Sequence, residues 1–475
     1  MIGSPAGTHR ESALHSTTPG RSSDQRLGWL GLGLTLVVYG VLAFGYVTLT
    51  PIWQNPDEPA HYTYVAFVAG TGGLPELRQG DWDSALLERL KTGTLQPGDS
   101  ITTIRYENWQ PPLFYLLAAP IVRLGSTDDP AQLLPRLRGL DVVFGAMTLV
   151  LAYAVARHLF EPNLALAVPL TMVGVPMFVA VSAALSADPL ANLLAAAIVL
   201  VLLKRPERAV DDLQLQLPAA ADGRQLRRPA AANSRQLQRR GAADDRWSVL
   251  LGALLGLGLL TKLELGIFVP IALGVIAARS VRKVRDCAIV LIITAVVVTP
   301  WLVHQVTTYG WTDPLALARH AQVVGDQPRF PGFSLDWAGE FLIVSFHSFW
   351  AQFGWMAIVA PVRLYAVWGI AAAAALVGLV LARRRLRHPE WLLMLATVAV
   401  AFVAYVGYNL AFEQFQSRYV FTALTPIAAL LVMGWATILP RRTLPWSVLL
   451  VPAALVALNA YTLLRVLVPG FTPPG

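Results

Sequence analysis

Apolar runs long enough to cross a membrane recur along this chain, and short connections rich in Lys and Arg separate them. A helix needs about 20 residues to cross about 30 Å of hydrocarbon, and only helices or closed barrels can span a bilayer. The runs are continuous rather than alternating, which favours helices. Of the 475 residues, 55% are hydrophobic and only 14% are charged. The sequence therefore predicts an all-α, polytopic integral membrane protein.

The basic connections predict the side of the membrane on which each loop lies, because Lys and Arg accumulate in cytoplasmic loops. The basic residues behind the net charge of +8 gather there, so the charge does not indicate nucleic-acid binding. The connections are residues 157–158, 204–246, 279–285, 383–387 and 441–442. All of them are cytoplasmic only if the short apolar run at 111–124 does not span. This choice gives about 11 spans, with a cytoplasmic N-terminus and an extracytoplasmic C-terminus.

The expected parts are a disordered cytoplasmic tail at 1–26, an N-terminal membrane module at 27–203 with a large outer loop at 50–136, a disordered basic cytoplasmic loop at 204–246, and a C-terminal module at 247–475 with an outer loop at 307–360. Short surface helices are expected at 58–69 and 81–91, within the first outer loop. Residues 164–185 are predicted to form one continuous span. Residues 341–361 are predicted to form a re-entrant or interfacial segment.

The run at 247–278 has basic residues on both flanks, so it must cross the membrane twice, as a hairpin. Its two arms are short, which places the tip between them below the outer surface. The tip carries Lys262 and Glu264. Charged side chains at such a depth need a wet or paired environment.

The predicted outer face collects polar residues from distant parts of the chain. They are Asp57, Glu58, His61, Glu107, Gln110, Ser186, Asp188, Lys262, His347, Gln414, Gln416 and Arg418. Carboxylates at the mouth of a span, such as Asp57 and Asp188, suit a general base. Lys262 and Arg418 suit a phosphate or pyrophosphate. The sequence has no nucleotide-binding glycine motif, so any transferase without a nucleotide site would need another kind of donor, such as a lipid-linked one.

Each of these candidates also has a structural alternative. Asp57 and Glu58 suit the start of a helix, where carboxylates are favoured by the helix dipole. Asp188 suits the N-cap of the following helix. Arg418 beside Tyr419 suits an anchor at the membrane interface. The residue patterns alone leave these alternatives open.

Several segments, in order along the chain, resemble motifs of the GT-C superfamily of membrane glycosyltransferases, which includes protein O-mannosyltransferases and the aminoarabinose transferase of lipid A. The segments are Pro56-Asp57-Glu58, Asn108-Trp109-Gln110-Pro111-Pro112-Leu113-Phe114-Tyr115, Arg138-Gly139, the residues 182–188, Gly258-Leu259-Leu260-Thr261-Lys262 and Ser417-Arg418-Tyr419. Residues 55–62 and 349–355 resemble a bacterial branch of predicted membrane proteins. One departure is that Asn108-Trp109 stands where many relatives have a histidine-containing sequence.

The resemblance implies transfer of a sugar from a polyprenyl-phosphate-linked donor on the outer face. Asp57 would be the general base, with Glu58 as its neighbour, and displacement in one step would invert the anomeric centre. Asp188 would be a second acidic site that helps to bind the acceptor or a metal, and Lys262 and Arg418 would hold the donor phosphate. The rest of the expected donor- and substrate-binding set is His61, Gln110 and Tyr419.

The sugar, hexosyl or pentosyl, and the acceptor, which is a protein, lipid or polysaccharide, stay open. So does metal dependence: Asp57 and Asp188 are the expected ligands if the site binds Mg²⁺ or Mn²⁺. Two other functions compete. In a transporter or lipid flippase, Lys262, Glu264 and Asp141 would line a substrate path. The chain would otherwise be an inactive GT-C-like scaffold in envelope assembly.

Overall fold

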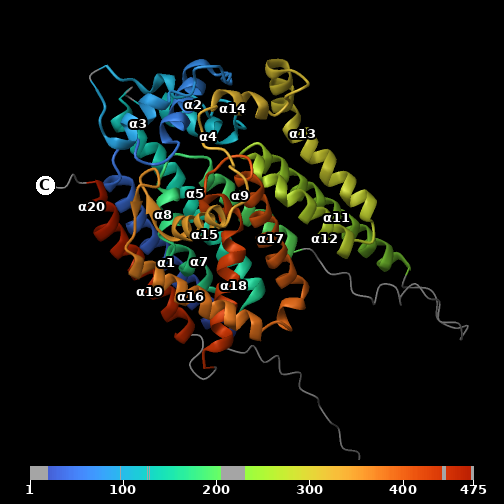
Figure 1. Ribbon diagram of the computed structural model, residues 1–475. Coiled ribbons are helices and arrows are strands. Elements are labelled where there is room, and N and C mark those ends of the chain that lie inside the picture. The colour runs from blue at the N-terminus through green and yellow to red at the C-terminus, as the bar shows by residue number, and fades with distance from the viewer. Residues whose placement is uncertain are drawn as a thin grey trace, which may run out of the picture.

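Figure 1 shows the computed structural model of the chain, which describes residues 20–96, 98–125, 127, 129–204, 230–440 and 446–471. Within these residues the fold is helical apart from one two-stranded sheet, which confirms the predicted all-α class. Most of the expected disordered tail and loop lies outside the described residues. The last residues of the expected tail, 20–26, are helical because α1 (Gly20–Leu49) begins there. The last residues of the expected loop, 230–246, are helical because α11 (Ala230–Leu259) begins there.

Seven helices in the described part of the chain are long and apolar enough to cross a membrane, or eight if one bent pair counts as a single span. They cover Arg26–Leu49, Pro130–Leu159, Lys283–Tyr309, Val362–Leu381, Pro389–Asn409, Ser417–Ile438 and Ser447–Phe471. Leu113–Arg123 and Asp188–Leu203 are apolar but shorter. The larger total of 11 spans stays a prediction.

Two short helices of the first loop gather at one end of the bundle, which we call the loop end (Figure 1). α2 (Glu58–Thr71) is followed by Gly72, whose φ of 73° suits a residue without a Cβ atom. α3 (Ser84–Thr92) begins after Asp83, whose carboxylate accepts a hydrogen bond from the first turn. Both predicted surface helices of this loop are confirmed.

A third short helix, α4 (Leu113–Arg123), packs against α2 at the loop end, near η1 (Ile101–Thr103). Its 11 residues rise about 16 Å at 1.5 Å per residue, which is too short to cross the hydrocarbon. This length agrees with the expectation that residues 111–124 do not span.

The segment predicted as one span at 164–185 is broken. It forms α6 (Pro162–Ala165), α7 (Ala167–Val173) and α8 (Pro176–Ser182). The helical stretches on either side of the break before Pro176 are bent by 71°. Proline lacks the N–H that would continue α7, so a new helix starts there in another direction. The prediction of a continuous span was therefore wrong.

The chain passes from α8 through a short non-helical segment into α9 (Asp188–Leu203), almost all of which is buried. α5 (Pro130–Leu159) and α11 both pack against α9. Because α9 lies inside the bundle, its first residue, Asp188, is buried at the loop end and not on the surface.

The remaining elements complete the bundle. They are η2 (Leu263–Ile267), α12 (Phe268–Arg279), α13 (Lys283–Tyr309), α14 (Leu317–Val323), α15 (Leu335–Trp350), β1 (Gln352–Phe353), β2 (Ile358–Val359), α16 (Val362–Leu381), η3 (Arg385–Arg387), α17 (Pro389–Asn409), η4 (Ser417–Ala423), α18 (Leu424–Ile438), α19 (Trp446–Thr462), η6 (Leu463–Leu467) and α20 (Val468–Phe471). β1 and β2 form an antiparallel hairpin. α15 lies across the bundle in Figure 1, which fits the re-entrant or interfacial segment predicted there.

Candidate active site

Asp57 has an unusual backbone conformation. Its φ of 64° is left-handed, which costs a residue with a Cβ atom about 1–2 kcal/mol. Asp57 occupies the N-cap position of α2, yet its side chain makes no capping hydrogen bond. Its carboxylate instead accepts a hydrogen bond of 2.8 Å from the Tyr106 hydroxyl and contacts Arg418. The geometry thus directs this carboxylate away from the helix and toward other side chains.

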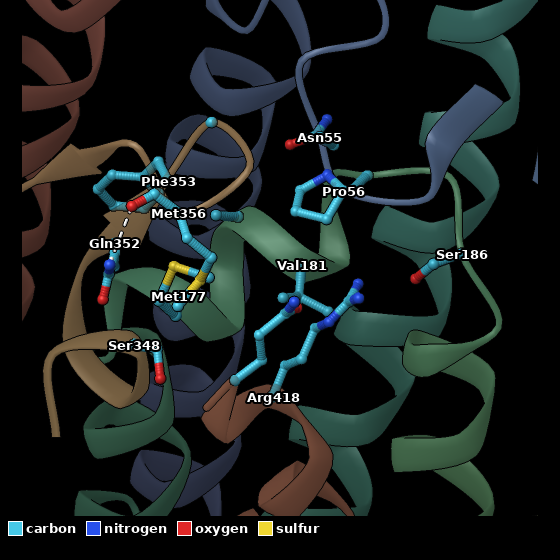
Figure 2. Close-up of a pocket in the computed structure, with 14 residues that line it drawn as sticks. Asn55, Pro56, Met177, Val181, Ser186, Ser348, Gln352, Phe353, Met356 and Arg418 are labelled. Atoms are coloured by element: carbon cyan, nitrogen blue, oxygen red, sulfur yellow. Dashed lines mark hydrogen bonds between the residues drawn. The ribbon is translucent and has the colours of Figure 1, made fainter. Parts of the chain in front are cut away.

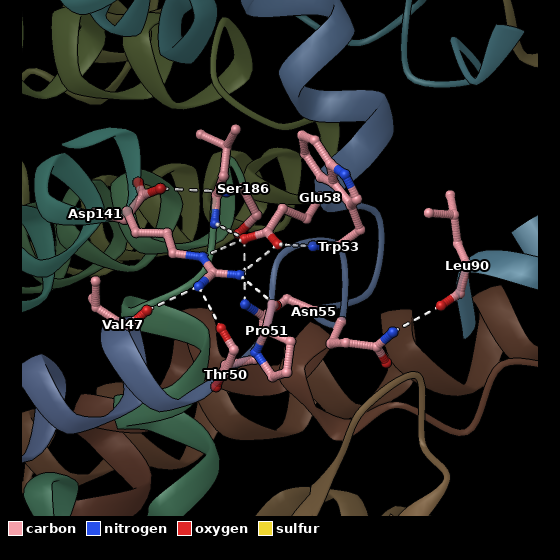
Figure 3. Close-up of polar contacts among 12 residues, drawn as sticks. Val47, Thr50, Pro51, Trp53, Asn55, Glu58, Leu90, Asp141 and Ser186 are labelled. Carbon is pink, nitrogen blue, oxygen red and sulfur yellow. Dashed lines mark hydrogen bonds and ion pairs between the residues drawn. The ribbon is translucent and has the colours of Figure 1, made fainter. Parts of the chain in front are cut away.

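A buried ion pair holds the loop that presents Asp57 (Figure 3). Glu58 is 0% exposed, and its two carboxylate oxygens lie 2.8 and 2.7 Å from Nε and Nη2 of Arg138 in α5. Arg138 also donates to three backbone carbonyls, those of Val47, Thr50 and Pro51. The end of α1 and the start of the loop are therefore fastened to α5.

Glu58 itself accepts three more hydrogen bonds, from the Trp53 N–H, the Asn55 side chain and the Leu185 N–H. A carboxylate with so many donors, buried completely, has no free face for a substrate. The structure thus places this sequence-predicted site residue behind Asp57, where it positions the loop. Arg138 was quoted in the sequence only as part of a motif; a charge inside an apolar run was the signal that it has a buried partner.

Arg418 links two carboxylates that are far apart in the chain. It is the second residue of η4, and its guanidinium contacts the Asp57 carboxylate and lies 3.6 Å from that of Asp188. The Arg418 side chain is only 8% exposed. It therefore lies inside the bundle between two acidic partners and does not act as an interfacial anchor.

Lys262 extends this chain of charges from the tip between α11 and α12. Its ammonium contacts Asp188 and lies 3.7 Å from the Glu264 carboxylate. Lys262 thus has the paired environment that we expect for a charged side chain beside apolar helices. Asp188 makes no capping bond to α9, because its oxygens face Lys262 and Arg418. The structure brings these residues and Asp57 into one connected cluster.

The electrostatics of the cluster favour an ionised Asp57. Burial alone would raise the pKa of Asp57, but the positive charge of Arg418, together with hydrogen bonds from Arg418 and the Tyr106 hydroxyl, lowers the pKa below its usual value. His61 lies in α2, and its Nδ1 is 2.9 Å from the Tyr115 hydroxyl. Burial lowers the pKa of His61 to about 4, so its ring is neutral at pH 7.

Glu107 is a buried carboxyl group beside this cluster. Burial and the negative charge of Asp57 raise the pKa of Glu107 to about 8, against the opposing effect of a hydrogen bond with the Gln110 side chain. Its Oε2 has no hydrogen-bond partner among the described residues. Sequence reasoning placed Glu107 on the outer face without giving it a role. Gln110, an expected binding residue, therefore reaches the cluster through Glu107.

Aromatic side chains from several elements form a wall near the cluster. Tyr419 lies beside Arg418, and the Lys262 ammonium is 5.1 Å from the centre of its ring. On the second outer loop, the His320 ring lies 4.7 Å from that of Trp109 and 5.7 Å from that of Phe412. Aromatic rings offer flat apolar faces with polar edges, which is a surface that packs well against a ring-shaped substrate.

A small pocket lies beside Arg418 and mixes polar and apolar lining residues (Figure 2). Arg418, Asn55 and Ser186 are polar lining residues, and Met177 and Phe353 are apolar ones. The polar Ser348 and Gln352 lie on the same side of the pocket as Met177 and Phe353. Met177 belongs to α8, which begins at the break before Pro176. Phe353 belongs to β1, which follows α15. The pocket has a volume of only about 30 Å³, so a ligand with a charged group and an apolar chain needs its walls to move apart.

The donor set does not fit a divalent metal ion. No group of three or more His, Cys, Asp and Glu side chains suited to a metal occurs in the described part of the chain. The two carboxylates expected to bind Mg²⁺ or Mn²⁺, Asp57 and Asp188, each face a cationic side chain instead. A site that already balances its carboxylates with Arg and Lys has little remaining charge for a cation.

Comparison with solved structures identifies the architecture. ArnT from Cupriavidus metallidurans bound to undecaprenyl phosphate matches with a TM-score of 0.51 and 15% identity, over 93% of this chain and 73% of that one. The oligosaccharyltransferase of Archaeoglobus fulgidus, in complex with Zn and sulfate, matches with a TM-score of 0.50 and 14% identity, over 90% of this chain and 52% of that one. The sequence matches no protein-family model and no curated protein. The chain therefore shares its fold with these two solved structures, as the resemblance to the GT-C superfamily led us to expect.

Proposed function

We propose that this protein is a membrane glycosyltransferase that moves a sugar from a polyprenyl-phosphate-linked donor to an acceptor hydroxyl, with the loop end on the extracytoplasmic side. The observation that carries the proposal is the contact of Arg418 with both Asp57 and Asp188 beside a pocket with polar and apolar lining residues. The fold shared with ArnT, whose structure contains undecaprenyl phosphate, supports the lipid-linked donor.

In this mechanism the donor phosphate binds Arg418 and Lys262, and the pocket widens so that the lipid chain packs against Met177 and Phe353. Asp57 accepts the proton of the acceptor hydroxyl as the acceptor oxygen forms its bond to the anomeric carbon. The bond from that carbon to the phosphate oxygen breaks, and polyprenyl phosphate leaves with its electron pair. Attack opposite the leaving group in one step inverts the anomeric centre.

The pairing of Arg418 with Asp57 couples donor binding to base strength. Without the donor, Arg418 lowers the pKa of Asp57 and keeps the carboxylate ionised. A bound phosphate shares the positive charge of Arg418, which weakens this effect and makes Asp57 a stronger base. His61, neutral and hydrogen-bonded to Tyr115, completes the wall beside Asp57 without adding charge. Tyr419 and Gln110 are proposed to contact the sugar.

The contacts favour an enzyme over a transporter. The transport hypothesis needs Lys262, Glu264 and Asp141 along a polar path. Lys262 and Glu264 instead belong to the cluster with Asp188, and Asp141 is 0% exposed, with a hydrogen bond from the Ser186 N–H. These side chains are held in fixed pairs near one end of the bundle.

The test is transfer by the purified protein from radiolabelled polyprenyl-phosphate sugars to cell-envelope acceptors. Loss of the general base in Asp57→Asn should lower the rate by a factor of about 10²–10⁴. Glu340→Gln, which changes an exposed carboxylate of α15, is the matched control and should transfer at the wild-type rate. Retained transfer by a folded Asp57→Asn protein, or no transfer by the wild type from any donor, would reject the proposal.

A further inference from the structure

A second hollow, with a volume of about 690 Å³, lies between α2, η1, α4 and the start of α5. α2 lines it with two rows of residues, 62, 66 and 69, and 63, 67 and 70. Most of these positions lie on the side of α2 that points away from His61, since a helix advances about 100° per residue. Asp57, Asp188, Lys262 and Arg418 do not line the hollow. The hollow, which we call the loop-end groove, is thus separate from the Asp57 cluster.

Two arginines line the loop-end groove, and each has more N–H groups than its backbone contacts use. Arg123, at the end of α4, donates to the Val68 and Ala69 carbonyls and so closes the C-terminus of α2. Arg105 donates through Nε to the Thr102 carbonyl. A guanidinium has five N–H donors, so both side chains can bind a further acceptor. Each is exposed, which keeps these donors within reach of a ligand.

The other polar lining groups suit the same kind of ligand. Thr102 and Ser100 bring hydroxyl groups that are 3.1 Å apart. No Asp or Glu occurs among the described lining residues. The carboxylate of Asp129, next to the groove, accepts hydrogen bonds from Ala131 and Gln132 at the start of α5. Asp81 interacts electrostatically with Arg105. The groove therefore presents two guanidiniums and hydroxyls to an anion.

The groove also borders a candidate membrane span. Its lining residues Pro130 and Leu133 belong to the first turn of α5, which is one of the candidate membrane spans. Leu124, directly after Arg123, is 87% exposed, and Leu116 and Leu117 on α4 are 47% and 45% exposed. Exposed leucines on a short helix beside a span suit contact with acyl chains, while the adjacent arginine reaches the headgroup.

We propose that the loop-end groove binds the phosphate of an anionic phospholipid, with Arg105 and Arg123 on the headgroup and the exposed leucines of α4 on the acyl chains. Guanidiniums bind phosphate oxygens in a bidentate fashion, and a basic residue near an anionic membrane surface strengthens binding. The bound lipid would fasten α2 and α4, and with them the loop that carries the Asp57 cluster, to the membrane surface.

The test compares the whole protein in nanodiscs of phosphatidylcholine alone and of phosphatidylcholine with phosphatidylglycerol. Thermal unfolding and native mass spectrometry report stabilisation and retained lipid. The wild type should retain phosphatidylglycerol and unfold at a higher temperature when it is present. Arg105→Gln should weaken phosphatidylglycerol retention about fivefold, and adding Arg123→Gln should weaken it further. Arg78→Gln, which changes an exposed loop-end arginine paired with Glu76, is the control and should behave as the wild type.

Each variant is compared with itself in the two lipid compositions. Any general loss of stability on removing Arg123 from the end of α2 acts in both, so it does not change the difference between the two lipids. The single Arg105→Gln variant, which leaves that contact intact, carries the test if the double variant does not fold. Inorganic phosphate, glycerol phosphate and polyprenyl phosphate form separate arms in phosphatidylcholine. Equal retention of phosphatidylglycerol in the wild type and Arg105→Gln, or protection by soluble phosphate or polyprenyl phosphate but not by phosphatidylglycerol, would overturn the proposal.

Discussion

Arg418 contacts Asp57 although the two residues are 361 positions apart in the chain. η4, near the C-terminal end of the described chain, supplies the arginine, and the loop before α2 supplies the carboxylate. The contact closes the N- and C-terminal parts of the bundle around one site. It also makes the proton affinity of Asp57 depend on a side chain from a distant part of the chain, which leads directly to a first prediction.

Removal of the guanidinium in Arg418→Ala should weaken donor binding and change the pH dependence of transfer. Arg418 lowers the pKa of Asp57, so its loss raises that pKa. The acid limb of the rate profile, where Asp57 becomes protonated, should therefore move to higher pH, and the apparent affinity for the lipid donor should fall by about tenfold or more. Transfer rates measured from pH 4 to pH 8 at several donor concentrations check both effects.

An Arg418→Lys variant keeps a positive charge but cannot bind in a bidentate fashion. It should restore part of the pH profile and little of the donor affinity. An Arg418→Ala protein with the wild-type acid limb would show that the two side chains are not coupled in solution.

The buried pair of Glu58 and Arg138 should matter for stability more than for chemistry. Glu58→Gln leaves the Arg138 guanidinium buried without its counter-ion, which costs about 3–5 kcal/mol in comparable pairs. We expect a lower unfolding temperature, and a lower kcat with little change in KM for the donor, because the Asp57 loop is less well held. Glu76→Gln, in an exposed ion pair, is the control. Wild-type stability in Glu58→Gln would contradict this positioning role.

The conformation of Asp57 predicts an order of stability among inactive variants. At a φ of 64°, glycine avoids the penalty that a Cβ atom carries. Asp57→Gly should therefore be more stable than Asp57→Ala by about 1 kcal/mol, although both lack the carboxylate and should not transfer sugar. Equilibrium unfolding of the two purified variants measures the difference. Equal stability would mean that the loop relaxes to negative φ.

Glu107 predicts a pH dependence of stability. Its carboxyl group binds its proton more tightly in the folded protein, with a pKa of about 8, than in an unfolded chain. The folded state thus holds more protons between about pH 4.5 and pH 8, so this group's contribution to stability falls as the pH rises through that range. Glu107→Gln, which cannot ionise, should flatten the fall.

The measurement is the unfolding midpoint of the wild type and Glu107→Gln at several pH values from 5 to 9. The difference between the two proteins should favour the variant increasingly up to about pH 8 and then stay constant. Parallel curves for the two proteins would show that Glu107 is solvated in the folded state.

The sequence by itself determined the class of structure and much of the loop end. The preference of a segment for water or hydrocarbon depends on its own residues and not on its neighbours in the fold. Apolar runs and basic connections therefore predicted the membrane helices and the short α4. Local cues likewise predicted α2 and α3. The candidates Asp57, Asp188, Lys262 and Arg418 could be named because charged residues beside apolar runs are costly unless they have partners.

Only the tertiary structure decided which partners those residues have. Glu58 and Asp57 are neighbours in the sequence, but they have different partners in the folded protein. Glu58 pairs with Arg138, and Asp57 pairs with Arg418. The break before α8 likewise replaced a predicted continuous span and helped to form a wall of the pocket. Ion pairing depends on distances of a few ångströms between segments far apart in the chain, and those distances are set by how the whole bundle packs.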